Sequence, residues 1–80
     1  MKNKRTYAVV IEKGPSSWGA YVPDLPGCVA VGKTSAEARK MIREAIEFHL
    51  EGMQLAGETL PKPSAIITEI SATLPALAHA

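Results

Sequence analysis

The chain has 80 residues, of which 46% are hydrophobic and 21% charged, with a net charge of +1. This composition is that of a globular domain and excludes a disordered chain. A chain of this length buries ~60% of the surface that its unfolded form exposes, which suffices for one small core. The near-neutral charge excludes a protein that binds nucleic acid by charge alone.

Cysteine content and hydropathy exclude two further classes. The chain has one cysteine, Cys28, so it forms no internal disulfide. The basic start from Met1 to Arg5 precedes only a short, interrupted apolar run, which is too short for a signal peptide. No window approaches the ~18 apolar residues of a membrane span. We therefore expect a cytoplasmic protein without a membrane partner.

The first predicted elements form a β-hairpin. Residues 6–11 are rich in β-branched and aromatic side chains, and their apolarity indicates a central strand. Residues 14–17 carry turn chemistry, and residues 18–22 return as a second strand that ends at Pro23. A rigid loop follows, formed by Pro23, Asp24, Leu25, Pro26 and Gly27. Residues 28–32 predict a third short strand.

An amphipathic helix is the clearest pattern in the chain. Thr34 and Glu37 fit a capping box, and Gly57 fits a C-terminal stop, so we expect a helix from Ser35 to Ala56. Its apolar face holds Ala38, Met41, Ile42, Ala45, Ile46, His49, Leu50 and Met53. The opposite side holds Glu37, Lys40, Glu44, Glu47, Glu51 and Gln54.

The helix leads to a fourth predicted strand. Residues 60–64 form an extended proline-containing linker, residues 65–70 predict the strand, and residues 72–80 predict a tail. The order βββαβ, with a right-handed crossover, places the fourth strand parallel to the first. We therefore expect one α+β domain over residues 1–80, with its core at about 5–71. Its mixed four-stranded sheet has the order 3-2-1-4 and carries the helix on one face.

Both faces of this sheet are substantially apolar, but only one helix is available to cover them. Tyr7, Val9 and Ile11 point to one face, and Ala8, Val10 and Glu12 point to the other. Uncovered apolar patches and free strand edges are both routes to association. We expect a homodimer or a tetramer, built on the helix-free face or on a strand edge.

The chain offers few residues for catalysis. Metal-dependent nuclease chemistry needs clustered carboxylates, whereas Glu12, Asp24 and Glu69 are scattered over the predicted elements. We expect no enzyme, no cofactor and no metal. His49 fits a packed position on the helix, and His79 has no partner at metal-binding spacing. For Asp24 we favour a carboxylate that binds backbone amides and locks its own turn, with a partner contact as the alternative.

The run from Pro23 to Cys28, followed by residues 31–38 with their capping box, resembles the HicB family of antitoxins. The resemblance extends from Tyr7 to Ser64, where a Pro-x-Pro precedes the last strand. It implies a partial ribonuclease-H-like fold and a toxin partner, a small HicA-like ribonuclease that cleaves mRNA. Family members often carry a further C-terminal DNA-binding motif. The ten residues after Ile70 are too few for one, so we do not expect direct DNA binding by this sequence.

Two surfaces are candidates for facing a toxin. A surface that masks a ribonuclease complements a basic cleft, which favours Glu44, Glu47 and Glu51 on the helix. The rim of the loop at residues 23–27 is the other candidate, and the alternative that the helix glutamates are only solvated stays open. The second reading of function is a stand-alone dimeric module, regulatory or associated with nucleic acid, without a toxin.

Overall fold

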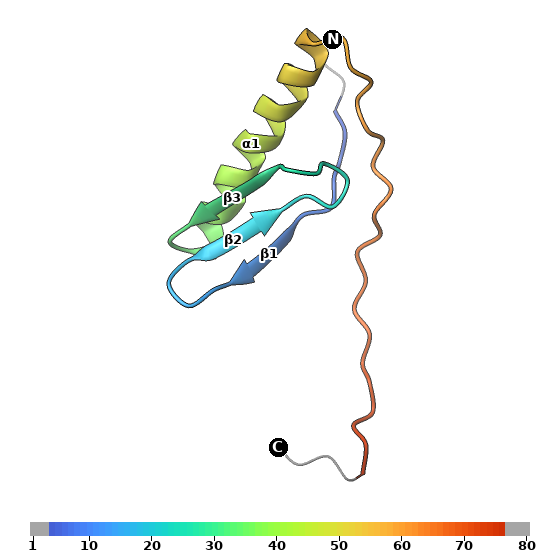
Figure 1. The fold of residues 1–80 in the computed structure, drawn as a ribbon. Coiled ribbons are helices and arrows are strands. Elements are labelled where there is room, and N and C mark those ends of the chain that lie inside the picture. The colour runs from blue at the N-terminus through green and yellow to red at the C-terminus, as the bar shows by residue number, and fades with distance from the viewer. Residues whose placement is uncertain (1–3, 77–80) are drawn as a thin grey trace.

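A computed structural model describes residues 4–76. Three strands and one helix follow one another in the chain: β1 (Val10–Lys13), β2 (Trp18–Tyr21), β3 (Val29–Gly32) and α1 (Ser35–Leu55). The strands form an antiparallel sheet, α1 lies across one face of it, and the segment after α1 runs away from the sheet as an extended chain (Figure 1). The α+β class is confirmed. Among the described residues, no helix combines the length and apolarity that a membrane span needs.

The sheet has the order β1-β2-β3, as expected for the first three strands. Ala20 pairs with Ile11 on one side and with Ala30 on the other, which fixes the register of all three strands. The first strand begins at Val10 rather than at residue 6 and extends to Lys13. The reason lies in β2: Tyr21 pairs with Val10, and β2 ends there before Pro23, so residues 6–9 have no partner on it.

The helix has the predicted start and stop. Thr34 Oγ1 accepts a hydrogen bond from Glu37 N at 3.0 Å, while Glu37 Oε1 accepts from Lys33 N at 2.9 Å, one residue before the cap. At the other end Gly57 has a φ of +74°. Its N–H donates to Gln54 O at 3.0 Å, and Glu58 N donates to Met53 O at 2.9 Å. This is a Schellman motif, which needs a left-handed residue and hence favours glycine.

The core lies between α1 and the sheet. Ala20, Val22, Leu25, Ala38 and Ile42 are buried, and Tyr7 and Cys28 complete the core. Val9 and Ile11 pack against it, so the helix covers the face that the odd-numbered residues of the first strand share. Gly32 allows the closest approach between the two layers, because a Cβ there would lie 2.5 Å from Ala38 N.

The expected fourth strand is not formed among the residues that the structure describes. Residues 60–75 are extended, but among residues 4–76 the sheet contains only β1, β2 and β3. The order 3-2-1-4 is therefore observed only for its first three members, and β1 is an edge strand instead of a central one. Alternation of side chains predicts a strand conformation, but a strand also needs a neighbour with free backbone groups.

Candidate functional site

The loop at residues 23–27 connects two parts of the chain. Asp24 Oδ2 accepts hydrogen bonds from Ser64 N at 2.9 Å and from Ala65 N at 3.1 Å, and Asp24 Oδ1 accepts from Ser64 Oγ at 2.7 Å. These bonds lower the pKa of the Asp24 carboxyl, the Ser64 backbone N–H most of all, so the carboxylate form is favoured. We call this contact the Asp24 latch.

The turn itself is held by other groups. Leu25 N donates to Val22 O and Cys28 N donates to Leu25 O, each at 3.0 Å. Leu25 is only 1% exposed, and Gly27 takes a φ of +84° that other residues rarely adopt. Asp24 does bind backbone amides as expected, but the expectation that it locks its own turn is wrong. Its partners lie forty residues further along the chain.

Two residues before β1 support the same connection. Arg5 Nη1 donates to Leu60 O at 3.0 Å and to Pro61 O at 2.9 Å, and the Tyr7 hydroxyl also donates to Pro61 O. The Asp24 latch and these bonds hold the chain after α1 at two places.

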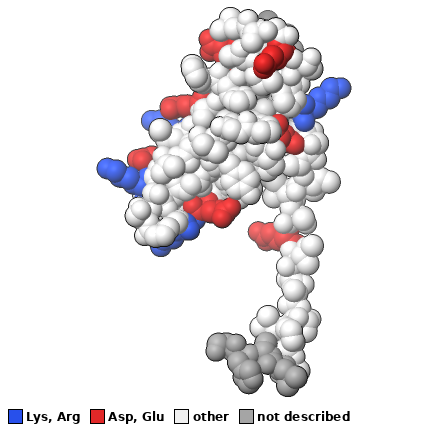
Figure 2. Space-filling model, viewed as in Figure 1, with Lys and Arg blue, Asp and Glu red and all other residues white. Residues whose placement is uncertain are grey.

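The three helix glutamates lie on the exposed side of α1. Glu44, Glu47 and Glu51 are all exposed, as expected for a partner-facing or a solvated surface. From Glu44 to Pro61 the chain has four glutamates and no lysine or arginine. Acidic side chains lie at the end of the molecule where α1 stops, and others are spread over the rest of the visible face (Figure 2). Basic residues at a helix C-terminus would interact favourably with its dipole, so this charge distribution is not one that helix stability selects.

Exposed apolar side chains run beside these glutamates. Met41, Phe48 and Leu55 follow one another at seven-residue intervals, with Ala45 and Gly52 between them, and we call these five residues the α1 seam. Alternating spacings of four and three place all five on one side of the helix. Phe48, the only phenylalanine in the chain, is 79% exposed, and Leu55 is 82% exposed.

The sequence pattern placed Met41 and Ala45 on the apolar face. Ala45 does pack against the core, whereas Met41 is 43% exposed, and the pattern did not single out Phe48 or Leu55. The seven-residue spacing was a signal that could have found the seam. Gly52 is a second signal, because glycine is unfavourable inside a helix. A Cβ at Gly52 would meet no atom within 4 Å, so packing within the described chain does not require glycine there.

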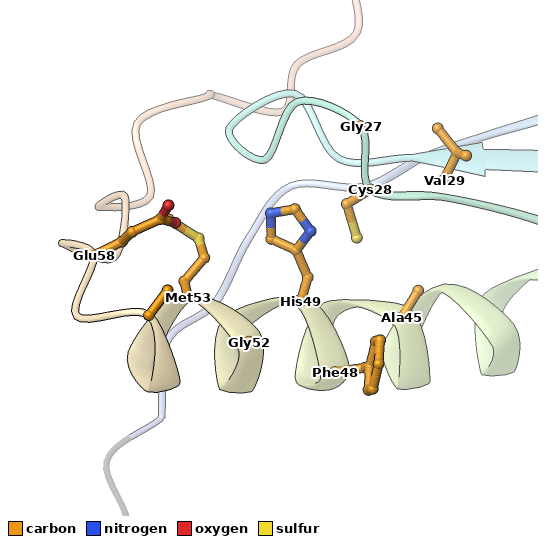
Figure 3. A pocket seen from close by; sticks show the side chains of 10 residues that line it. Gly27, Cys28, Val29, Ala45, Phe48, His49, Gly52, Met53 and Glu58 are labelled. Atoms are coloured by element: carbon orange, nitrogen blue, oxygen red, sulfur yellow. The ribbon is translucent and has the colours of Figure 1, made fainter.

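A groove of about 460 Å³ lies between the seam and the start of β3. Its lining includes Cys28 and Val29 on one side and Phe48, His49 and Met53 on the other. The His49 side chain points from α1 toward Cys28, and the Met53 side chain lies beside Glu58 (Figure 3). Burial raises the pKa of the Cys28 thiol, so it stays protonated and a weak nucleophile at neutral pH.

The helix-free face of the sheet is a second candidate surface. Tyr21, Val29 and Val31 are exposed on it. Between them lies a shallow hollow of about 450 Å³ over Gly19, where a Cβ would meet no atom within 4 Å. The expected uncovered apolar face is therefore present.

The structure also places the cap residues of α1 and the carboxylates considered for catalysis. Thr34 and Glu37 begin the helix, and Glu12 lies in β1. Within residues 4–76, no three side chains of His, Cys, Asp or Glu come together as a set that holds a metal ion. His79 lies outside the described residues.

Comparisons with known proteins identify the family. The model of the HicB-like antitoxins of bacterial toxin–antitoxin systems matches residues 7–74. A 14.9 kDa protein from the rep–hol intergenic region of Haemophilus phage HP1 is 45% identical over 60 residues, which are 75% of this chain and 45% of that protein. A UPF0150 protein of Thermoplasma acidophilum is 38% identical over 60 residues, or 74% of this chain and 87% of that protein.

A solved structure agrees with the family model. A chain of the HicA3 and HicB3 toxin–antitoxin complex superposes with a TM-score of 0.65 at 33% identity, over 75% of this chain and 70% of that chain. The chain spans less than half the length of the phage relative. The match to the family model nevertheless covers most of this chain, so the chain belongs to the family of HicB-like antitoxins of bacterial toxin–antitoxin systems.

Proposed function

We propose that this protein is an antitoxin that binds a small HicA-like ribonuclease and blocks its cleavage of mRNA. Membership of the antitoxin family and likeness to a chain of a toxin–antitoxin complex support this proposal. Because such a toxin acts on mRNA, we propose the cytoplasm as the site of action. The partial ribonuclease-H-like fold, including a fourth strand, belongs to the same proposal.

The observation in this chain that carries the proposal is the α1 seam with its flanking glutamates. A protein that binds RNA has a basic surface, and acidic residues at the edge of an interface steer such a partner and fix its orientation. Phe48 supplies an exposed aromatic side chain, a type that is enriched at the cores of protein interfaces. Gly52 leaves room for a partner to approach the helix backbone closely.

Charge reversal tests this surface. We expect Glu44→Lys, Glu47→Lys and Glu51→Lys together to weaken capture of the basic protein encoded in the neighbouring reading frame, measured as Kd and as RNA cleavage. Phe48→Ala should weaken binding by at least ~10-fold. Glu12→Lys is the control for a single charge reversal, to be compared with each of the three helix variants alone, since it makes one such change on the exposed part of β1. Unchanged affinity in the triple variant and in Phe48→Ala would leave the loop at residues 23–27 as the remaining candidate surface.

We propose that the protein itself is not a nuclease. The absence of a metal-holding set of side chains in the described part of the chain supports this. Purified protein with Mg²⁺ or Mn²⁺ should leave RNA and RNA–DNA hybrids intact. Metal-dependent turnover that disappears in Glu12→Gln would contradict the proposal.

We also propose that the protein self-associates as a homodimer or tetramer. The exposed Tyr21, Val29 and Val31 and the free edge of β1 support this. Light scattering at micromolar concentration measures the mass directly, and a monomer throughout that range would contradict it.

A further inference from the structure

The segment from Ala65 to Leu74, which we call the outer segment, carries four exposed large apolar side chains. Ile66 is 88% exposed and Ile70 is 84% exposed, and Ile67 and Leu74 are similar. Exposed apolar surface of this extent usually marks a site of association.

The outer segment has the sequence pattern of a strand with one covered face. Ile66, Thr68, Ile70, Ala72 and Leu74 share one side of an extended chain. The other side holds Ala65, Ile67, Glu69, Ser71 and Thr73. The first set is dominated by large apolar side chains and the second is mostly polar. This alternation is typical of a strand that packs on a core along one side.

The contacts at its start direct the outer segment away from its own sheet. The Asp24 latch holds Ser64 and Ala65, and from there the chain continues in nearly one direction while β1 turns toward β2 (Figure 1). Residues 65–70 contain no glycine, proline, asparagine or aspartate, so they lack the usual means of turning back. Pro61 and Pro63 stiffen the chain just before the latch.

Because the outer segment runs away from the sheet, the molecule is longer than a compact chain of the same length. Its radius of gyration is 16.3 Å, against about 12 Å for a compact chain of 80 residues. Its longest axis is 55 Å, while the other two are 28 and 21 Å. An extended segment from Ala65 to Leu74 spans ~30 Å, which is far enough to reach a neighbouring molecule.

We propose that the outer segment is an exchanged strand: in a dimer it pairs with the free edge of β1 in a second copy of this chain, and the second copy reciprocates. The proposal rests on the self-association proposed above and names the element that produces it. The crossover topology places a fourth strand beside β1, and β1 has a free edge among the described strands. In the exchanged dimer, the outer segment of the second copy occupies the position beside β1.

The side chains on the two sides of β1 fit this arrangement. Val9 and Ile11 face the core side and Glu12 is exposed on the other. A strand with Ile66, Ile70 and Leu74 on its core side and Glu69 on its outer side continues both surfaces. Two reciprocal strands with their apolar faces reach the scale of about 1,000 Å² that a specific interface needs. A twofold axis relates the two copies, so the β1 edge of each copy is paired in the same way.

Charge favours a second copy over a basic toxin as the partner of this segment. From Ala65 to Ala76 the only ionisable side chain is Glu69, so the outer segment offers little attraction to a basic surface. The α1 seam with its flanking glutamates remains the proposed surface for the toxin, and the two interfaces use different elements.

Paired lysine substitutions test the exchange. Ile70→Lys with Leu74→Lys places two charges on the apolar side, and Ser71→Lys with Thr73→Lys places the same charges on the polar side as a control. We expect the first variant to be monomeric by light scattering and the control to remain dimeric. Circular dichroism should show unchanged helix content in both, because the outer segment lies outside the core.

The outcomes separate this inference from the proposals on which it rests. If the first variant stays dimeric, the exchange is wrong and self-association through another surface stands. If the unchanged protein is monomeric, both are wrong. Capture of the toxin by the monomeric variant tests the antitoxin proposal independently, since the α1 seam is intact in it.

Cysteine cross-linking tests the position of the strand. In a Cys28→Ala background, one chain carries Glu12→Cys and a co-expressed chain carries a cysteine at 67, 69 or 71. We expect a disulfide between the two chains for at least one of these positions, and none when Val31→Cys on β3 replaces Glu12→Cys. Cross-links to β3 alone, or only within one chain when both cysteines are on the same molecule, would overturn the assignment to β1 of a second copy.

Discussion

Asp24 connects the loop before β3 to the chain beyond α1, and its carboxylate is the acceptor in all three hydrogen bonds of the latch. The pKa of this carboxyl is lower in the folded protein than its ordinary value of 3.8. A group with a lowered folded pKa stabilises the fold above its unfolded pKa. That contribution is lost as the pH falls through the folded value.

We therefore predict that the latch is intact at neutral pH and opens only in acid, below the ordinary pKa of an aspartate. Amide hydrogen exchange at Ser64 and Ala65, followed by NMR as the pH is lowered, should show protection disappearing in that range. Asp24→Ala should abolish the protection at neutral pH. Glu69→Gln removes a carboxylate from the same segment outside the latch and is the control. Protection that survives Asp24→Ala would show that other contacts hold these residues.

Two glycines near the start and the end of α1 differ in how much space a Cβ would have. Gly32 lies where β3 meets the first turn of the helix, and a Cβ there would lie 2.5 Å from Ala38 N and 2.9 Å from Glu37 C. Backbone atoms of this kind cannot move aside as a flexible side chain can. Gly52 lies in the last third of α1 with open space around the position of a Cβ.

We predict opposite effects of the same substitution at these two glycines. Gly32→Ala should lower the free energy of unfolding by about 1–3 kcal/mol, because the sheet and helix must separate. Gly52→Ala should raise it by about 0.5–1 kcal/mol, because alanine favours the helix. Urea unfolding of the two variants and the unchanged protein measures both. If a partner packs closely on the α1 seam, Gly52→Ala should also weaken toxin capture, in spite of its greater stability.

At the scale of the whole molecule, the charge is nearly balanced but unevenly distributed. The net charge is +1, whereas residues 44–61 carry four glutamates and no lysine or arginine. A partner meets the field of this acidic region and not that of the net charge, and salt weakens that field by screening. An antitoxin that uses this end of the molecule should therefore show electrostatically steered association.

We predict that association with the toxin slows by about tenfold or more between low and high ionic strength, while dissociation changes little. Stopped-flow or surface-binding kinetics at several salt concentrations measures both rates. The triple variant of Glu44, Glu47 and Glu51 to lysine should lose this salt dependence. An association rate that is independent of salt in the unchanged protein would contradict electrostatic steering through α1.

The sequence by itself determined the elements whose causes are local. The capping residues Thr34 and Glu37 and the stop at Gly57 fix α1 to within one residue, because each acts on backbone groups a few positions away. The hairpin and the third strand also follow from turn residues and side-chain alternation. The loop at residues 23–27 was found for the same reason, because prolines and glycine restrict the backbone where they stand.

The tertiary structure decided which distant groups meet, because no local pattern encodes a contact across the chain. Only the fold shows that Asp24 binds Ser64 and Ala65, and that Arg5 and Tyr7 hold Pro61. It also shows that Phe48 and Leu55 are left exposed and that residues 65–70 pair with no strand among residues 4–76. Alternating side chains predict that a segment is extended, whereas pairing depends on a free edge within reach, and its position is set by the three-dimensional path of the chain.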